Sequence, residues 1–159
     1  MEFIKHNPSK LLVIITLGFI MYGVSSCEKS DEFPGGMSKA TVDGENINAC
    51  DVCISVEKTD FNFSISFTSE SSDDETIGFT MPEEPQVGTH TLGSRNYSAY
   101  YTSLDGVYTT SNDGSGTLEI LETTYNADNE IVELTANFNF IAKKSNGESV
   151  EVTNGVLIY

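Results

Sequence analysis

The chain has 159 residues, of which 24 are Asp or Glu and 8 are Lys or Arg, so its formal net charge at pH 7 is −16. This charge argues against nucleic acid as a partner, because a polyanionic backbone requires a basic protein surface. Hydrophobic residues make up 38% of the chain and aromatic residues 10%, which is typical of a single folded domain rather than of a disordered chain.

The first 26 residues have the organisation of a secretory signal peptide. Lys5 and Lys10 precede an apolar run at 11–21, and small residues follow at 24–26. As a helix, the apolar run would extend roughly 17 Å, about half of the hydrocarbon thickness of a bilayer. We therefore expect residues 1–26 to be removed rather than retained as a transmembrane helix.

The segment Val24-Ser25-Ser26-Cys27 resembles a bacterial lipobox. The resemblance implies cleavage before Cys27 and lipidation of Cys27, whose acyl chains would hold the protein on a membrane. The next residues, 28–32, resemble the tag that sends lipoproteins of the Bacteroidota to the cell surface. They imply an outer-membrane lipoprotein at the cell surface, with a periplasm-facing orientation as the alternative, and residues 27–36 as a flexible tether.

The remaining residues, 37–159, are predicted to form one all-β domain. Apolar side chains recur with period two in 61–68 and 131–143, and Asp-Gly and Asn-Gly pairs separate such runs. The pattern predicts an antiparallel β-sandwich or meandering barrel of about nine strands, since two of the following ranges could merge. These ranges are 38–42, 53–58, 61–68, 76–81, 88–93, 97–104, 107–111, 116–125, 131–143 and 148–158.

In the last predicted strand, a polar residue falls on the same face as the apolar residues. Val150, Val152, Val156 and Ile158 share a face on which Asn154 would also point inward. Either a β-bulge at Asn154-Gly155 releases the side chain, or a buried amide needs partners; we expect the bulge.

Cys50-Asp51-Val52-Cys53 is the one group with the spacing of a metal or redox site. A zinc site needs further ligands that the chain lacks, and a thioredoxin-type site needs a helix where a strand continues. A structural disulfide between Cys50 and Cys53 is the main expectation, with free thiols as the alternative. Residues three apart in an extended strand lie roughly 10 Å apart, so a bridge requires a turn.

No catalytic signature is found. His90 is the single imidazole after residue 26, and the chain has no nucleophile-elbow pattern. We expect no catalytic residue, no cofactor and no metal. A hydrolase that uses paired carboxylates is the third hypothesis for the function.

Three tyrosines form the candidate contact patch. In a hairpin that turns at Asp105-Gly106, Tyr97, Tyr101 and Tyr108 share one face of the sheet, and Leu104 and Val107 share the other. If Leu104 and Val107 mark the buried face, the tyrosines face outward and could contact an extracellular glycan or protein.

Gly116-Thr117-Leu118-Glu119-Ile120, Ala136-Asn137-Phe138-Asn139-Phe140 and Val150-Glu151-Val152-Thr153-Asn154-Gly155 resemble a family of small all-β lipoproteins of the Bacteroidota without an assigned function. The resemblance implies fold and location only. The hypothesis is therefore a lipid-anchored, non-enzymatic binding domain. The alternative is a lipocalin-like barrel that encloses a small apolar ligand.

Overall fold

The computed structural model describes residues 38–59, 61–72 and 74–159 and, of residues 50–52, the backbone alone. The predicted signal peptide 1–26, the tether 27–36 and Cys27 lie outside the described residues. The strands are β1 (Lys39–Val42), β2 (Glu45–Lys58), β3 (Asn62–Ser69), β4 (Thr76–Pro82), β5 (Gly88–Leu92), β6 (Ser98–Ser103), β7 (Gly106–Thr109), β8 (Ser115–Tyr125), β9 (Ile131–Lys143) and β10 (Ser149–Ile158). Within these described ranges, no helix has the length and apolar character needed to cross a bilayer.

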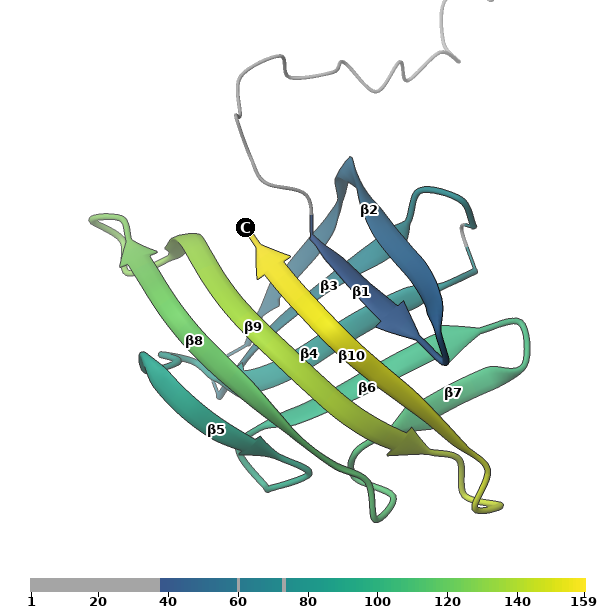
Figure 1. The fold of residues 1–159 in the computed structure, drawn as a ribbon. Coiled ribbons are helices and arrows are strands. Elements are labelled where there is room, and N and C mark those ends of the chain that lie inside the picture. The colour runs from purple at the N-terminus through teal and green to yellow at the C-terminus, as the bar shows by residue number, and fades with distance from the viewer. Residues whose placement is uncertain (1–37, 60, 73) are drawn as a thin grey trace, which may run out of the picture. The chain divides into compact units, whose positions relative to one another are not determined.

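The strands form an antiparallel β-barrel, which confirms the predicted fold class. Eight of them close a ring in the order β10-β1-β2-β3-β4-β6-β7-β9, and β9 returns to β10. β8 pairs with β9 over most of its length, and β5 pairs with β8. In Figure 1, β8, β9, β10 and β1 form the near layer, and β3, β4 and β6 cross behind them.

The interior of the barrel is packed with aromatic side chains. Phe79 contacts Phe138 edge to face at a centroid distance of 4.8 Å and contacts Phe140 at 6.1 Å. Phe67 lies 6.3 Å from Phe138. All four rings are at most 3% exposed, and burial of each contributes about 1.5–3 kcal/mol. These residues come from strands of both layers, so they hold the two layers together.

The predicted bulge in β10 is confirmed. Val152 lies opposite Phe140 and Gly155 lies opposite Phe138, so β10 contains one residue more than β9 over this stretch. Asn154 takes up the extra length with φ 51°, in the left-handed region that asparagine tolerates, and its side chain is exposed. The bulge changes the phase of the strand, and Leu157 therefore enters the core while Val156 and Ile158 stay half-exposed.

β2 belongs to both layers and begins eight residues earlier than predicted, at Glu45 instead of 53. Its first part pairs with β1 and its second with β3. Between these parts, five steps along β2 from Ala49 to Ile54 correspond to two steps along β3 from Ser69 to Phe67. This irregular corner is a break in the extended strand of the kind a bridge between Cys50 and Cys53 requires. The side chain of Cys50 is outside the described residues, so the disulfide stays a prediction.

Candidate functional site

The exposed tyrosine patch predicted from the sequence is wrong. Tyr97, Tyr101 and Tyr108 are 9%, 6% and 6% exposed and belong to the core, whereas Leu104 and Val107 are 84% and 58% exposed. The turn lies at Leu104-Asp105, because Ser103 pairs with Gly106 and Tyr101 with Tyr108. Apolar side chains at a hairpin tip extend past the sheet that would cover them, and so they do not identify its buried face.

Tyr101 and Tyr108 are nevertheless brought together, at one mouth of the barrel. Their ring centroids lie 6.0 Å apart. The Tyr101 hydroxyl donates to Glu75 Oε1 at 2.8 Å, and the Tyr108 hydroxyl donates to Glu148 Oε1 at 3.2 Å. Burial raises the pKa of Tyr101, and the hydrogen bond to Glu75 raises it further. The Tyr101 phenol therefore serves as a neutral donor to the Glu75 carboxylate.

Lys144 completes the contacts of Tyr108. Its Nζ lies 4.5 Å from the centroid of the Tyr108 ring and 2.9 Å from Glu148 Oε2. The contact with Tyr108 and that with Glu148 raise the pKa of Lys144, and Lys144 in turn lowers the pKa of Glu148. An ammonium group is thus held between an aromatic face and a carboxylate on the turn from β9 to β10.

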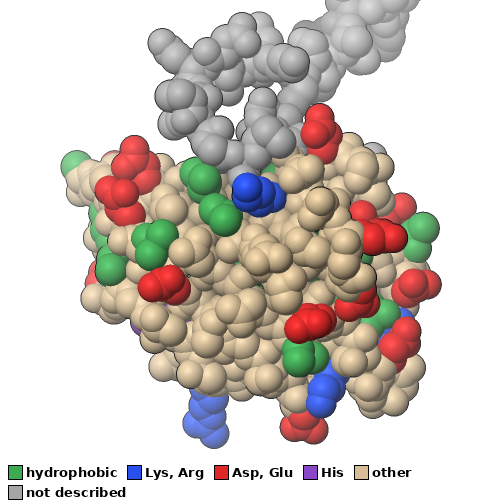
Figure 2. Space-filling model, in the orientation of Figure 1, with side chains coloured by type: hydrophobic (Ala, Val, Ile, Leu, Met, Phe, Trp, Pro, Cys, Tyr) green, Lys and Arg blue, Asp and Glu red, His purple; other side chains and the backbone are tan. Residues whose placement is uncertain are grey.

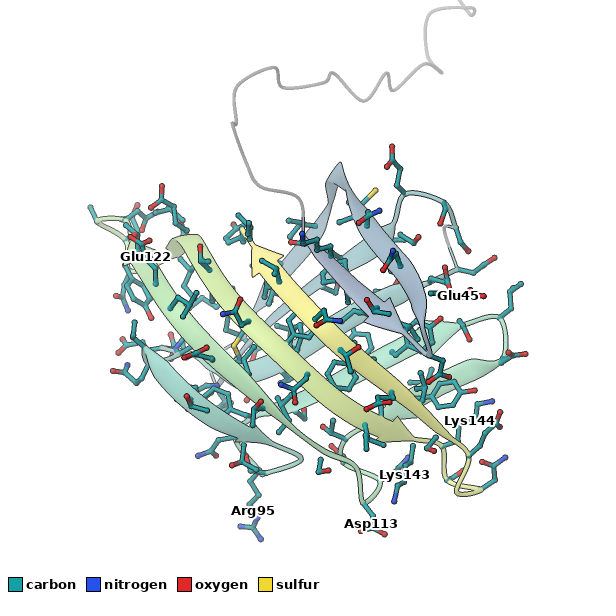
Figure 3. The ribbon with its side chains drawn as sticks, in the orientation of Figure 1. Glu45, Arg95, Asp113, Glu122, Lys143 and Lys144 are labelled. Carbon is teal, nitrogen blue, oxygen red and sulfur yellow. The ribbon has the colours of Figure 1, made fainter. Side chains whose placement is uncertain are left out.

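A hollow of about 280 Å³ opens beside these tyrosines. Its carboxylates come from Asp43, Glu45, Glu75 and Asp105. Within the part of the chain that the structure describes, no three His, Cys, Asp or Glu side chains are grouped so as to hold a metal ion. Of these carboxylates, Glu75 accepts the hydrogen bond of Tyr101, and Asp43 Oδ1 accepts one from the backbone N–H of Glu151. Glu45, labelled in Figure 3, is exposed at the start of β2.

Tyr97 stands apart from the other two tyrosines. Its ring stacks on His90 with a centroid distance of 4.0 Å and an interplanar angle of 13°. His90 Nε2 lies 2.6 Å from the carbonyl oxygen of Gln86. The contacts of His90 are therefore an aromatic ring and a backbone carbonyl, which fit a structural position in the middle of β5.

The most distinctive exposed surface is the outer face of β8, β9, β10, β1 and the first part of β2. Its side chains are mainly carboxamides and hydroxyls, and we call it the amide face. Its defining residues are Asn46, Asn48, Asn137, Asn139 and Asn154, together with Thr41 and Thr117. Figure 2 shows mainly uncharged atoms over the middle of this face, with a basic side chain at its upper edge and most acidic side chains toward its rim. A surface made mainly of uncharged polar side chains stands out in a chain of net charge −16.

The pairing of the strands places the amide face in two rows. The first row crosses β8, β9, β10, β1 and β2 in the order Glu119, Asn137, Val156, Lys39 and Asn48. In the second, Thr117 lies opposite Asn139 on one side, and Thr41 lies opposite Asn46 on the other. Each row crosses five strands, which at about 4.8 Å between strands makes a surface roughly 19 Å wide.

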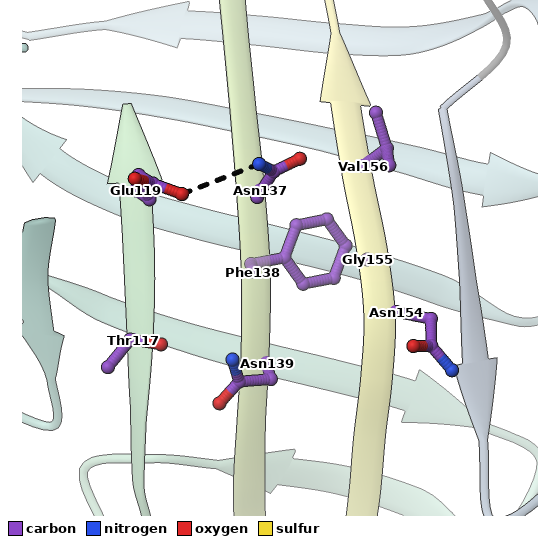
Figure 4. Close-up of a pocket in the computed structure, with 8 residues that line it drawn as sticks. All are labelled: Thr117, Glu119, Asn137, Phe138, Asn139, Asn154, Gly155 and Val156. Carbon is purple, nitrogen blue, oxygen red and sulfur yellow. Dashed lines mark hydrogen bonds between the residues drawn. The ribbon is translucent and has the colours of Figure 1, made fainter. Parts of the chain in front are cut away.

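A hollow of about 410 Å³ lies in the amide face at the bulge of β10, and we call it the bulge hollow. Figure 4 shows the Phe138 ring beside Gly155, with polar side chains on both sides. Its lining residues are Thr117, Glu119, Asn137, Phe138, Asn139, Asn154, Gly155 and Val156.

The polar groups of the bulge hollow differ in how they are bonded. Asn137 Nδ2 donates to Glu119 Oε2 at 3.4 Å. Among the described residues, the amides of Asn139 and Asn154 and the hydroxyl of Thr117 have no side-chain hydrogen bond. These three groups are free to bind a ligand, and the two amides offer both donors and acceptors.

The amide face was not selected from the sequence, although a signal for it is present. The outward positions of the period-two pattern in 131–143 include Glu133, Asn137 and Asn139. In so acidic a chain, the two asparagines stand at positions where further carboxylates would be expected. The presence of carboxamides instead of carboxylates on a solvent-exposed face is the signal in the sequence. The pairing of five strands, which assembles the face, is not visible in a single run.

The chain was also compared with known proteins. A family model described as a domain of unknown function, DUF6252, matches residues 38–159. Neither a curated protein nor a solved structure matches the chain. The matched residues begin immediately before β1 and include every strand of the barrel. The family model thus covers the whole β-barrel, and the chain belongs to the DUF6252 family.

Proposed function

We propose that this protein is a lipid-anchored, non-enzymatic binding domain of the bacterial outer membrane, displayed at the cell surface. The anchor is Cys27, exposed by removal of residues 1–26, and residues 27–36 are the tether. The lipobox and the acidic segment after it support this location. In the same reading, the DUF6252 family is a family of small lipoproteins of the Bacteroidota.

The amide face is the proposed contact surface, and the observation that carries the proposal is its predominance of uncharged polar side chains, with Glu119 and Lys39 as the charged members of its first row. Net charge keeps a protein soluble and repels molecules of like charge. The acidic side chains of this chain serve that role, while the middle of the amide face is mainly uncharged (Figure 2). A partner that meets this face encounters hydrogen-bonding groups with little electrostatic repulsion.

The lipocalin-like alternative is compatible with a closed barrel but has less support. An enclosed ligand would need a space that side chains leave free. Phe67, Phe79, Phe138 and Phe140 contact one another in the interior, and of these four only Phe138 borders one of the two hollows described above. The outer surface is therefore the better candidate for binding.

The location is tested in the full chain by replacing Cys27. Wild-type protein should sediment with the outer membrane and be digested by protease added to intact cells. The Cys27→Ser variant should leave the membrane fraction. Unchanged membrane partition of Cys27→Ser would reject the lipid anchor, and resistance of the wild type in intact cells but not in lysed cells would place it on the periplasmic side.

The contact surface is tested by adding charge to it. Asn137→Lys and Asn48→Lys place a long cation on the amide face, and Ser111→Lys places the same group on the exposed turn after β7. The purified protein should capture a component of the cell surface, and the first two variants should lose this capture while Ser111→Lys retains it. Equal capture by all three variants would exclude the amide face.

A further inference from the structure

We propose that the bulge hollow is a binding subsite for an uncharged pyranose unit of a glycan. This inference rests on the proposed function, since it names the class of partner for the amide face. It starts from how the hollow is formed. The extra residue of β10 turns Asn154 outward, and the next residue, Gly155, has no side chain. The ring of Phe138 packs against this glycine from the core side (Figure 4).

The floor of the hollow is therefore apolar and its rim is polar. Gly155, Val156 and Phe138 supply carbon atoms between β9 and β10. Asn139 and Asn154 lie on either side of this floor, on β9 and on β10. A pyranose ring has the matching distribution, with C–H groups on its faces and hydroxyls around its edge.

Carboxamides suit hydroxyl ligands because each amide both donates and accepts a hydrogen bond, as each hydroxyl does. The amides of Asn139 and Asn154 have no side-chain partner among the described residues, so binding breaks no existing side-chain bond. Glu119, which accepts from Asn137, retains lone pairs for a further hydroxyl.

The charge of the site selects against acidic ligands. Glu119 is the one charged side chain among the residues that line the hollow, and it is negative. Phosphates, sulfates and uronic acids would be repelled by this carboxylate and by the net charge of the chain. The volume of about 410 Å³ lies within the range of about 300–1,000 Å³ that is usual for small-molecule sites. An uncharged sugar unit is the ligand class that fits the size, the charge and the hydrogen-bonding groups.

The test uses the full chain purified in detergent and titrated with neutral hexasaccharides of glucose, mannose, xylose and N-acetylglucosamine. Oligogalacturonate serves as the anionic comparison. Titration to about 10 mM detects the millimolar affinity that a single shallow subsite supplies. We expect saturable binding of at least one neutral hexasaccharide and none of oligogalacturonate.

Two variants remove the free amides with little effect on the fold. Asn139→Ala shortens an exposed strand residue, and Asn154→Gly removes the amide while keeping the left-handed backbone. Each should weaken binding at least tenfold. Asn62→Ala is the matched control, because it deletes an exposed amide at the start of β3, outside both the hollow and the amide face. It should bind as the wild type does, and thermal melting verifies that all three variants fold.

The outcomes separate this inference from the proposed function. Failure of every neutral hexasaccharide to bind, or equal binding by wild type, Asn139→Ala and Asn154→Gly, overturns the subsite. If the wild type then still captures a cell-surface protein through the amide face, the proposed function stands with a different class of partner. Preference for oligogalacturonate over the neutral sugars also overturns the inference.

Discussion

Gly155 and Phe138 lie opposite each other on β10 and β9, and the ring of Phe138 occupies the space that a side chain at position 155 would need. A methyl group on Gly155 would overlap the ring. This pair links the aromatic core to the outer surface, because both residues also line the bulge hollow.

Gly155→Ala should therefore destabilise the domain. Overpacking of a filled core costs about 1–3 kcal/mol, and the ring cannot withdraw easily because Phe67 and Phe79 pack against it. The free energy of unfolding from urea titration measures the loss, with Ser149→Ala at the exposed start of β10 as control. In the double variant with Phe138→Leu, the added cost of Gly155→Ala should shrink. A Gly155→Ala variant as stable as the wild type would contradict the packing described here.

The second prediction concerns the buried tyrosines. Tyr101→Ala and Tyr108→Ala each remove a ring that is 6% exposed, and aromatic truncations of this kind cost about 3–5 kcal/mol. Leu104→Ala in the same hairpin should change stability by less than about 0.5 kcal/mol, because that side chain is 84% exposed. Comparable losses for Leu104→Ala and Tyr101→Ala would show that the tip of the hairpin is buried instead.

The third prediction is a pH dependence. Burial and Glu75 raise the pKa of Tyr101 in the folded protein above its unfolded value of about 10. The folded state keeps the phenol proton, so this contribution to stability is complete below pH 10 and decreases as the pH rises toward the folded pKa. Chemical denaturation between about pH 9 and pH 11 should show a steeper decline for the wild type than for Tyr101→Phe. Parallel declines would mean that Tyr101 ionises as freely in the folded state as in the unfolded one.

The strand pattern could be predicted from the sequence because it is set locally. Nine of the ten predicted ranges match strands with ends that differ by at most two residues, as for 131–143 and β9. Asn154 is instructive, because its polarity conflicts with the phase of Val152 and Val156, and a bulge is the local solution to that conflict. Period-two alternation and turn residues contain this information.

The buried face of the tyrosine hairpin could not be predicted in the same way. The sequence places Tyr101 and Tyr108 on one face, but which face is covered depends on strands far away in the chain. Glu75 and Glu148, which accept the hydrogen bonds of the two phenols, lie in the loop before β4 and the turn before β10. Leu104, at the tip of the hairpin, does not indicate the buried face, because distant strands decide which face is covered.

The fourth prediction concerns Cys50 and Cys53 at the corner of β2. A disulfide between them should protect both thiols from iodoacetamide until a reductant is added, as measured by mass spectrometry. Its closed loop is short, so its removal in Cys53→Ser should cost about 2 kcal/mol of stability. Alkylation of both residues in the folded, unreduced protein would show that the corner forms without the bridge.

If the amide face is where this protein meets its partner, amide chemical-shift mapping will locate the contact there. The spectrum of the folded protein would be recorded before and after addition of polymer released from the cell surface. We expect shifts concentrated in β8, β9, β10 and β1, with the largest at Asn139, Asn154 and Gly155. Shifts confined to the turns at 93–97 and 110–114, with none in these strands, would contradict it.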